Sequence, residues 1–204
     1  EDCISKGKDY YNGGPRYNTN YIQCTGLGTV TDSLSVLKKH VFEDKTFPME
    51  TILDAVAKNF EGEEVLRQRI LNRTPFFGND DEYADTIAVQ VYNDLLAAIE
   101  GKPNTKGECF HLNMLSTTCH VYFGLVLGAT PNGRFAGKSI YDGTSPSHGC
   151  DTHGPTNVIR SLGKLDQSKS GGTLLNLRFV PSLLKRDKDV EKLGHLIRSY
   201  FSLG

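Results

Sequence analysis

No stretch of this 204-residue chain approaches the roughly 20 consecutive apolar residues that a membrane-spanning helix needs. No basic segment followed by an apolar one marks a secretory signal. The formal net charge is only −1, with 23 basic residues among 24 acidic ones, so no long-range field attracts nucleic acid or an anionic membrane. These absences predict a cytoplasmic protein with neither a nucleic-acid partner nor a membrane partner.

Paired cysteines are also missing, because the chain has five and none forms a Cys-x-x-Cys motif. With 204 residues, of which 38% are hydrophobic, the chain can bury a core without disulfide staples. We therefore expect reduced thiols at Cys3, Cys24, Cys109, Cys119 and Cys150.

Patterns typical of metal sites are weak in this chain. The histidines and cysteines of the second half have spacings that match no standard zinc pattern. Buried thiols and hydrogen-bonded imidazoles are the favoured interpretation, and a metal site is the minor alternative. Consecutive carboxylates at Asp80, Asp81 and Glu82 are better explained by the dipole of a following helix than by a cation. The groups considered for zinc are Cys109-x-His111, Cys119-His120 and His148-x-Cys150-x-x-His153.

Apolar residues recur at helical spacing through the first half of the chain and at its end. Thr31-Asp32 suits the N-cap of the first helix, Pro48 suits the first turn of the second, and Thr74-Pro75 ends the third. The helices predicted in this way span about residues 31–42, 48–62, 65–73, 80–100, 155–165 and 187–201.

Strands are predicted only in the second half. β-Branched and aromatic residues are dense from Cys109 to Leu127, which indicates a strand beginning near Phe110, although the part from His120 onward also suits a helix. A second strand is predicted over 172–180. The chain is thus a single α/β unit over residues 1–204, helix-rich in its first half and mixed in its second.

Turn-forming residues dominate two long segments, 1–28 and 141–153, which predicts irregular but ordered loops. In the second, Thr144-Ser145-Pro146-Ser147-His148 places hydroxyls beside an imidazole, as a nucleophile and its base would require. No Gly-x-Ser-x-Gly elbow surrounds these serines, so a turn that satisfies its own backbone is the favoured reading. Turns are also predicted at Gly26-x-Gly28 and at residues 130–134.

Several of these stretches, taken in order, resemble the glycyl radical enzymes of the pyruvate formate-lyase superfamily. The loop Thr144–Gly149 and the segment Leu112–Thr118 look most like the hydroxyproline dehydratase branch, with the glycerol, choline and pyruvate branches as alternatives. The blocks that carry the resemblance are Tyr10-Tyr11-Asn12-Gly13-Gly14-Pro15-Arg16-Tyr17-Asn18, Thr31-Asp32-Ser33-Leu34, Lys38-Lys39-His40-Val41-Phe42, Pro75-Phe76-Phe77-Gly78-Asn79-Asp80, Ser116-Thr117-Thr118-Cys119-His120-Val121-Tyr122-Phe123-Gly124, Thr130-Pro131-Asn132-Gly133-Arg134, Pro146-Ser147-His148-Gly149 and Gly154-Pro155-Thr156.

The resemblance implies a part of a ten-stranded barrel with helices outside. It implies an enzyme, often a homodimer, whose glycyl radical is installed by an iron-sulfur activase that uses S-adenosylmethionine. The radical converts a cysteine to a thiyl, which takes a hydrogen atom from a small substrate before water leaves. Shielding from solvent suits such chemistry.

Two motifs of that family are absent from these 204 residues. No cysteine is followed by a glutamate two positions later, and no Arg-Val-x-Gly-Tyr sequence occurs. We therefore expect an internal segment of the pyruvate formate-lyase-type domain, without the thiyl cysteine loop or the C-terminal glycine radical domain, and inactive alone. A catalytically inactive module that binds a partner chain is the alternative of another class.

The resemblance also suggests roles for individual residues. It places the Ser116-Thr117-Thr118 segment near the substrate, with Thr117 as the candidate for a hydrogen bond to it, and a packing role in the barrel wall as the alternative. It places Thr144, Ser145 and His148 in a loop that lines or plugs the barrel. Arg134 is expected to form a structural salt bridge, and no catalytic residue, cofactor site or metal site is expected in this segment.

Overall fold

Helices form most of the first half of the computed structural model, which describes residues 2–203. They are α2 (Leu27–Val36), which continues as a π-helix (Leu37–Glu43), α3 (Met49–Ala57), α4 (Glu64–Arg73) and α5 (Glu82–Ile99). The predicted helices are confirmed, but α2 begins earlier than expected. Gly26, with a φ of 86°, is its N-cap, and Thr31 and Asp32 lie buried inside the helix.

In the second half, the residues from His120 onward, whose sequence suits either a strand or a helix, are helical. Residues from Cys119 onward form α6 (Cys119–Val126), and the two predicted helices appear as α7 (Pro155–Leu162) and α8 (Asp187–Leu203). A short α1 (Cys3–Lys6) and 3₁₀ turns at Gln167–Lys169 and Pro181–Leu184 complete the list. No helix of residues 2–203 is long and apolar enough to cross a membrane.

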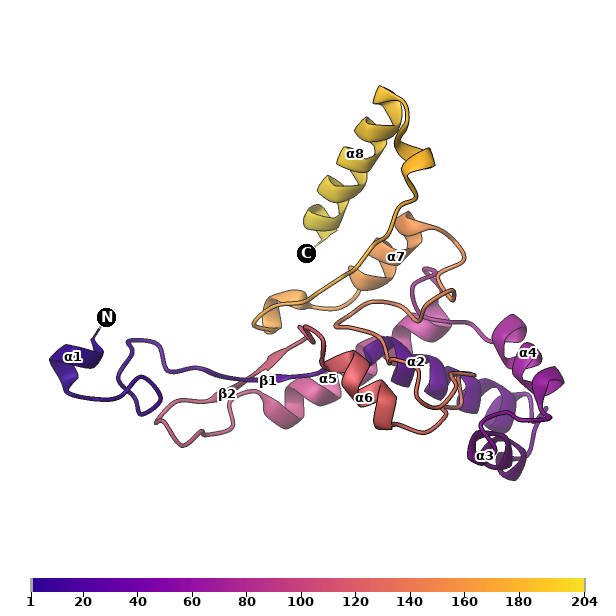
Figure 1. Cartoon of the computed structure of the whole chain (residues 1–204), viewed down its shortest axis with the longest axis horizontal. Helices are drawn as coiled ribbons and strands as arrows, with labels where there is room; N and C mark the ends of the chain where they lie inside the picture. The colour runs from indigo at the N-terminus through magenta and orange to yellow at the C-terminus, as the bar shows by residue number, and fades with distance from the viewer. Residues whose placement is uncertain (1, 204) are drawn as a thin grey trace.

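One parallel pair of strands, β1 (Asn20–Gln23) and β2 (Phe110–Asn113), forms the sheet. The strand predicted near Phe110 is confirmed, whereas β1 was missed because its surroundings are rich in turn formers. The ten-stranded barrel is not visible in the described residues, which contain only this two-stranded sheet. Figure 1 shows the strands running as a narrow ribbon toward α1 at the N-terminal end of an elongated molecule.

The predicted strand over residues 172–180 is wrong for most of its length. Thr173 forms a single parallel bridge with Met114, and Leu174 N donates to Met114 O at 3.2 Å. Beyond Leu174 the backbone has no neighbouring strand within residues 2–203. Because a strand exists only through hydrogen bonds to a neighbour, this stretch is irregular despite its β-branched and apolar composition.

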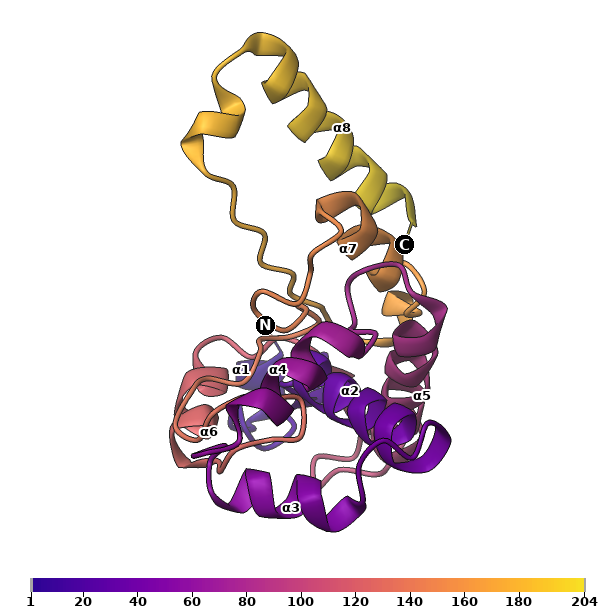
Figure 2. The same ribbon diagram turned by 90° about the vertical axis from the view of Figure 1, so that its right-hand side faces the viewer.

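Two clusters of buried side chains form the core. The first cluster contains Phe77 and side chains from α5, β2 and α7. Among them is Tyr92 of α5, which donates its hydroxyl hydrogen to Asp166 O at 3.1 Å. The second lies between α2, α3 and α4 around Ile52 and Ile70. By contrast, α8 has no buried residue and extends away from the first-half helices, with its C-terminal end near α7 (Figure 2).

An ionic cluster joins the start of α5 to the end of α7. Lys164 Nζ lies 2.7 Å from Asp85 Oδ2, 3.1 Å from Asp80 Oδ1 and 2.7 Å from Glu82 Oε1. Asp81 accepts a hydrogen bond from Tyr83 N as the N-cap of α5, which agrees with the predicted role of these carboxylates at a helix start. Burial raises the pKa of Asp85, and its contacts with Lys164 and Ser161 oppose that rise.

Replacement of Lys164 by methionine should strongly destabilise this junction. The carboxylate of Asp85 is fully buried and would lose its cation, which costs about 3–5 kcal/mol of unfolding free energy. The midpoint of chemical denaturation of the full-length gene product measures the loss. Lys169→Met is the matched control, because the Lys169–Asp166 pair is exposed and its loss should leave the midpoint unchanged. The double variant Lys164→Met with Asp85→Leu should recover most of the stability, and a failure to recover would contradict this account.

Candidate functional site

The carboxyl ends of three parallel segments lie side by side in this fold. They are β1, β2 and residues 171–174, which continue the sheet through the Met114–Thr173 bridge. Ligands of parallel α/β sheets bind at this edge, in loops that follow the strands. The residues after these ends, together with the loop 141–150, therefore form the candidate functional site.

The loop 141–150 is hydrogen-bonded to the segment that follows residue 173. Thr144 donates to Leu174 O twice, from its backbone N at 3.0 Å and from its Oγ1 at 3.1 Å. Asn176 N donates to Ser145 Oγ at 3.1 Å, and Asn176 Nδ2 donates to Asp142 Oδ2. These bonds fix one side of the loop.

The other side of the loop is bonded to the β1–α2 junction. Gly26 N and Thr25 Oγ1 both donate to Tyr141 O, at 2.8 and 3.0 Å. Tyr141 N in turn donates to Thr29 Oγ1 at 3.3 Å. The loop thus connects the start of α2 with the segment 171–176, although these regions are more than 100 residues apart in the chain.

The structure separates the predicted loop residues into two kinds. Thr144 and Ser145 are buried and hold the loop in place, as described above. His148 is exposed, and its ring lies 5.5 Å from the Tyr141 ring. No hydrogen bond joins His148 to a serine hydroxyl in the described part of the chain, so the geometry does not supply a nucleophile with its base.

Thr117 lies in a turn and not in a strand, because β2 ends at Asn113. Its φ is 48°, a value that a β-branched residue rarely adopts and that often marks a functional site. The side chain is exposed, and its Oγ1 donates to Ser116 O at 2.8 Å. Thr118, the N-cap of α6, has a φ of −113° and a ψ of 0°.

This left-handed residue followed by a right-handed one turns successive backbone N–H groups toward one side. Such an arrangement forms a concave site for anions, and a helix N-terminus favours negative charge there. The N–H groups of Thr117 and Thr118 have no acceptor among residues 2–203. The turn before α6 therefore combines a strained backbone, unused donors and an exposed hydroxyl.

Arg134 has a structural role, but the expected salt bridge is wrong. Its guanidinium donates to Phe135 O at 3.1 Å, to Lys138 O at 2.5 Å and to Gly128 O, and its Nε donates to Thr130 Oγ1 at 3.2 Å. No carboxylate pairs with it within residues 2–203. Carbonyl oxygens of the turn satisfy its donors, so a charged partner is not required.

Cysteine and histidine side chains do not gather into a metal site in the part of the chain that the structure describes. The five cysteines form no disulfide among residues 2–203. His120 Nδ1 lies 3.3 Å from the buried Ser116 hydroxyl, and His111 Nδ1 lies 2.9 Å from Glu100 Oε2. The imidazoles of this region thus hydrogen-bond to neighbouring side chains.

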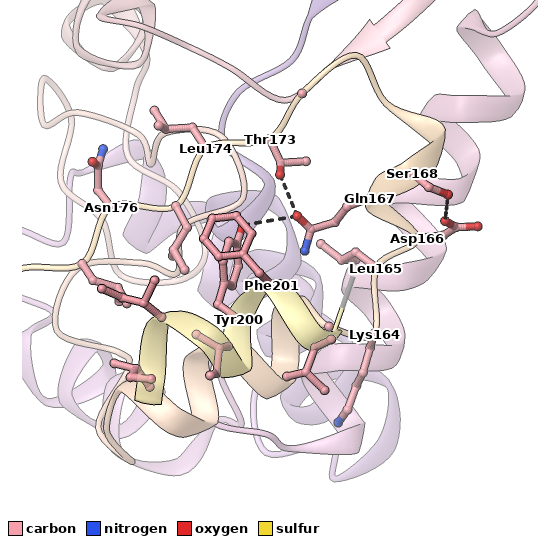
Figure 3. A pocket seen from close by; sticks show the side chains of 18 of the residues that line it. Lys164, Leu165, Asp166, Gln167, Ser168, Thr173, Leu174, Asn176, Tyr200 and Phe201 are labelled. Atoms are coloured by element: carbon pink, nitrogen blue, oxygen red, sulfur yellow. Dashed lines mark hydrogen bonds between the residues drawn. The ribbon is translucent and has the colours of Figure 1, made fainter. Parts of the chain in front are cut away.

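Two cavities lie near the site without containing its predicted residues. One of about 410 Å³ lies against the ends of β1 and β2, between Cys24, Met114 and Ile140. Another, of about 1080 Å³, lies beneath α8 and is mostly apolar. Figure 3 shows Gln167 at its wall, where its Oε1 accepts hydrogen bonds from Thr173 Oγ1 at 2.6 Å and from Tyr200 Oη at 3.3 Å.

Sequence reasoning missed the buried carboxyl group of Asp32, which it treated as part of an N-cap. Asp32 Oδ1 accepts a hydrogen bond from Phe77 N at 2.9 Å. Burial raises the pKa of Asp32 to about 7, against the opposing effects of Ser147 and the Phe77 N–H. The helical pattern alone does not reveal this, because the loop that covers Asp32 comes from residues more than 100 positions later.

Two family models match the chain. The model described as "pyruvate formate lyase-like" matches residues 1–124, and the model described as "glycine radical" matches residues 140–204. The candidate site takes its loop from the second region and its turn at Thr117 from the first.

Relatives of known function match over the whole chain or nearly so. Trans-4-hydroxy-L-proline dehydratase of Clostridioides difficile is 49% identical over 203 residues, which are 100% of this chain and 26% of that protein. Isethionate sulfite-lyase of Oleidesulfovibrio alaskensis is 39% identical over 194 residues, or 91% of this chain and 23% of that protein. The chain therefore spans about a quarter of the length of these relatives.

A solved structure agrees with these matches. The crystal structure of hydroxyproline dehydratase from Clostridioides difficile, with trans-4-hydroxy-L-proline bound, superposes with a TM-score of 0.95 at 49% identity. It covers 100% of this chain, and the chain covers 26% of it. The fold described above, including its irregular segments, is thus shared with that enzyme.

Replacement of Gly143 by alanine should displace the loop 141–150. A Cβ at this position would lie 2.5 Å from both Leu174 O and Met114 O, and the residue also has a φ of 45°. Gly137→Ala is the matched control, because its φ is 72° but its Cβ would meet nothing within 4 Å. Both variants carry backbone strain, whereas only Gly143→Ala should accelerate hydrogen exchange at the Thr144 and Leu174 amides of the full-length gene product. Equal exchange in both would contradict the packing described here.

Proposed function

The chain belongs to the pyruvate formate lyase-like family, and we propose that the protein containing it is a glycyl radical dehydratase of a small hydroxylated substrate such as trans-4-hydroxyproline. The observation that carries this proposal is the 49% identity, over the whole chain, to trans-4-hydroxy-L-proline dehydratase. The superposition with that enzyme at a TM-score of 0.95 supports it.

In this proposal the radical chemistry comes from outside these 204 residues. The segment lacks both the cysteine motif and the glycyl motif, so we propose that it contributes neither radical residue and expect it to be inactive alone. The match of residues 140–204 to the glycine radical model fits a segment that leads toward that motif. A glycyl radical, installed by an activase with S-adenosylmethionine, would convert a cysteine to the thiyl radical that takes a hydrogen atom from the substrate. We further propose a cytoplasmic homodimer.

The role of Thr117 is to bind substrate. Its exposed side chain, strained backbone and unused N–H donors would together hold a carboxylate at the N-terminus of α6. A packing role in the wall is less well supported, because the side chain is not buried by other described residues. Only a substrate that carries a negative group would gain from this arrangement.

The loop that contains Thr144, Ser145 and His148 would line the same site. Thr144 and Ser145 bond to Leu174 O and Asn176 N, so their contribution is to position the loop. His148 is the exposed member and would face the interior of the complete barrel. Its ring, beside that of Tyr141, would help to exclude water from the substrate.

Other reactions of the family remain as alternatives. The 39% identity to isethionate sulfite-lyase favours a second candidate, in which the group that leaves is sulfite and not water. The pyruvate, glycerol or diol, and choline branches are further alternatives. The alternative that is not an enzyme is an inactive module that binds a partner chain.

Activation of the full-length gene product and assay against a substrate panel would test the proposal. The panel contains trans-4-hydroxyproline, glycerol, choline, isethionate, and pyruvate with coenzyme A. Loss of water from trans-4-hydroxyproline is the expected result, and turnover of pyruvate with coenzyme A alone would overturn it. A reading frame without Cys-x-Glu upstream and Arg-Val-x-Gly-Tyr downstream would favour the inactive module.

Replacement of Thr117 by valine should weaken substrate binding while the shape of the side chain is kept. The Thr117 hydroxyl, which donates to Ser116 O, would turn to donate its one hydrogen to the substrate. Loss of a hydrogen bond to a charged group costs about 1.5–3 kcal/mol, which corresponds to a rise in KM of about ten- to a hundredfold. Steady-state kinetics of the activated full-length enzyme measure this change.

The neighbouring variant Thr118→Val is the control for Thr117→Val. Thr118 is also exposed, and its side chain makes no capping hydrogen bond to α6, so its KM should change little. Similar KM values for Thr117→Val and the wild type would remove Thr117 from the substrate site.

A further inference from the structure

The buried carboxyl group of Asp32 lies on α2 beneath the loop 141–150. Asp32 is 0% exposed, and its Oδ1 accepts one hydrogen bond, from Phe77 N. Its other oxygen, Oδ2, has no hydrogen-bond partner among the described residues, and neither does the hydroxyl group of Ser147, which is 1% exposed. Ser147 lies close enough to favour the charged form of Asp32, but the pair does not reach hydrogen-bond geometry.

The loop fits closely over this part of α2. A Cβ on Gly28, one turn before Asp32, would lie 2.7 Å from Ser145 O and 3.1 Å from Ser147 N. The loop backbone therefore rests directly on the helix, with no space for a bulk water layer between them. Any change in the charge of Asp32 acts on the contact between α2 and this loop.

No cation neutralises Asp32 in the described part of the chain. The titratable groups that face it from the loop are Tyr141 and Cys150, and burial is the main cause that raises the pKa of each. Two basic groups act on the pKa of these neighbours, whereas none is among the causes that shift the pKa of Asp32. Arg134 opposes the rise at Tyr141, and Arg67 opposes it at Cys150.

An ionised carboxylate in these surroundings has one backbone donor and a nearby hydroxyl to replace its hydration shell. Burial of a charge without a partner is costly, so ionisation favours states in which water reaches Asp32. The folded-state pKa of about 7 lies above the usual value of 3.8. The stabilisation from the neutral form is therefore complete at low pH and is lost as the pH rises toward about 7.

We propose that Asp32 is a positioning residue for the loop 141–150, which rests on α2 while the carboxyl group is neutral and loosens when it ionises. The inference rests on the proposed function only in that this loop lies at the proposed substrate site. Loop position is measurable without radical activation, so the two proposals can fail separately.

Alkylation of Cys150 in the full-length gene product reports the position of the loop. Cys150 lies in the loop, and Asp32 acts on its titration. The rate is measured by mass spectrometry in the wild type and in Asp32→Asn, and their ratio removes the pH dependence that the thiol has in both proteins. The charge of Asp32 also raises the pKa of Cys150 and so slows alkylation of the wild type, which means that only a looser loop can raise the ratio. Asparagine keeps the acceptor for Phe77 N and offers an amide donor to Ser147, so it mimics the neutral acid.

The ratio of wild-type to Asp32→Asn rates should rise about tenfold between about pH 6 and pH 8, as the ionised fraction of the carboxyl group does. A ratio that stays constant over this range would overturn the proposal. The exposed carboxylate variant Asp54→Asn on α3 is the control and should behave as the wild type.

A second variant tests the role of Asp32 if Asp32→Asn does not fold. Ser147 lowers the pKa of Asp32, so Ser147→Ala should move the midpoint of the alkylation profile to higher pH. Cys3 lies in α1, away from the loop and its contacts, and its alkylation rate serves as the internal reference in the same sample. An unchanged midpoint in Ser147→Ala would also contradict the role of Asp32.

Discussion

Close backbone contact between the loop 141–150 and its neighbours is the constraint on which the rest of this site depends. Gly143 lies against Leu174 O and Met114 O, and Gly28 lies against Ser145 O, at distances that leave no room for a side chain. Gly78 lies equally close to the side-chain ring of Pro146. Three glycines from separate parts of the chain thus allow one loop to join β2, α2 and the segment 171–176.

One chemical consequence follows from that packing. Because the loop covers α2, Asp32 loses contact with water and becomes a group that titrates near neutral pH. After Met114 the chain pairs with no further strand of residues 2–203, and it turns at Thr117 and enters α6 with unused N–H donors. The proposed substrate contact thus lies after the end of β2, and the proposed positioning residue lies beneath the loop.

The helices were predictable because their apolar periodicity is a local property of the sequence. Only part of the Lys164 cluster could be predicted from the sequence. The carboxylates at Asp80–Glu82 indicate a helix start, but the lysine that pairs with them follows α7, about 80 residues later in the chain. Strands were predicted less well. β1 was hidden among turn formers, and residues 172–180 have strand composition without a strand partner in residues 2–203.

The sequence by itself determined the family resemblance, the positions of the main helices, and the absence of the cysteine and glycyl motifs from these residues. Each of these is read from consecutive residues or from local spacing. The tertiary structure decided that Thr117 lies in a strained turn, that Arg134 bonds to carbonyl oxygens, and that Asp32 is buried. These depend on contacts between segments far apart in the chain, and local pattern carries no information about such contacts.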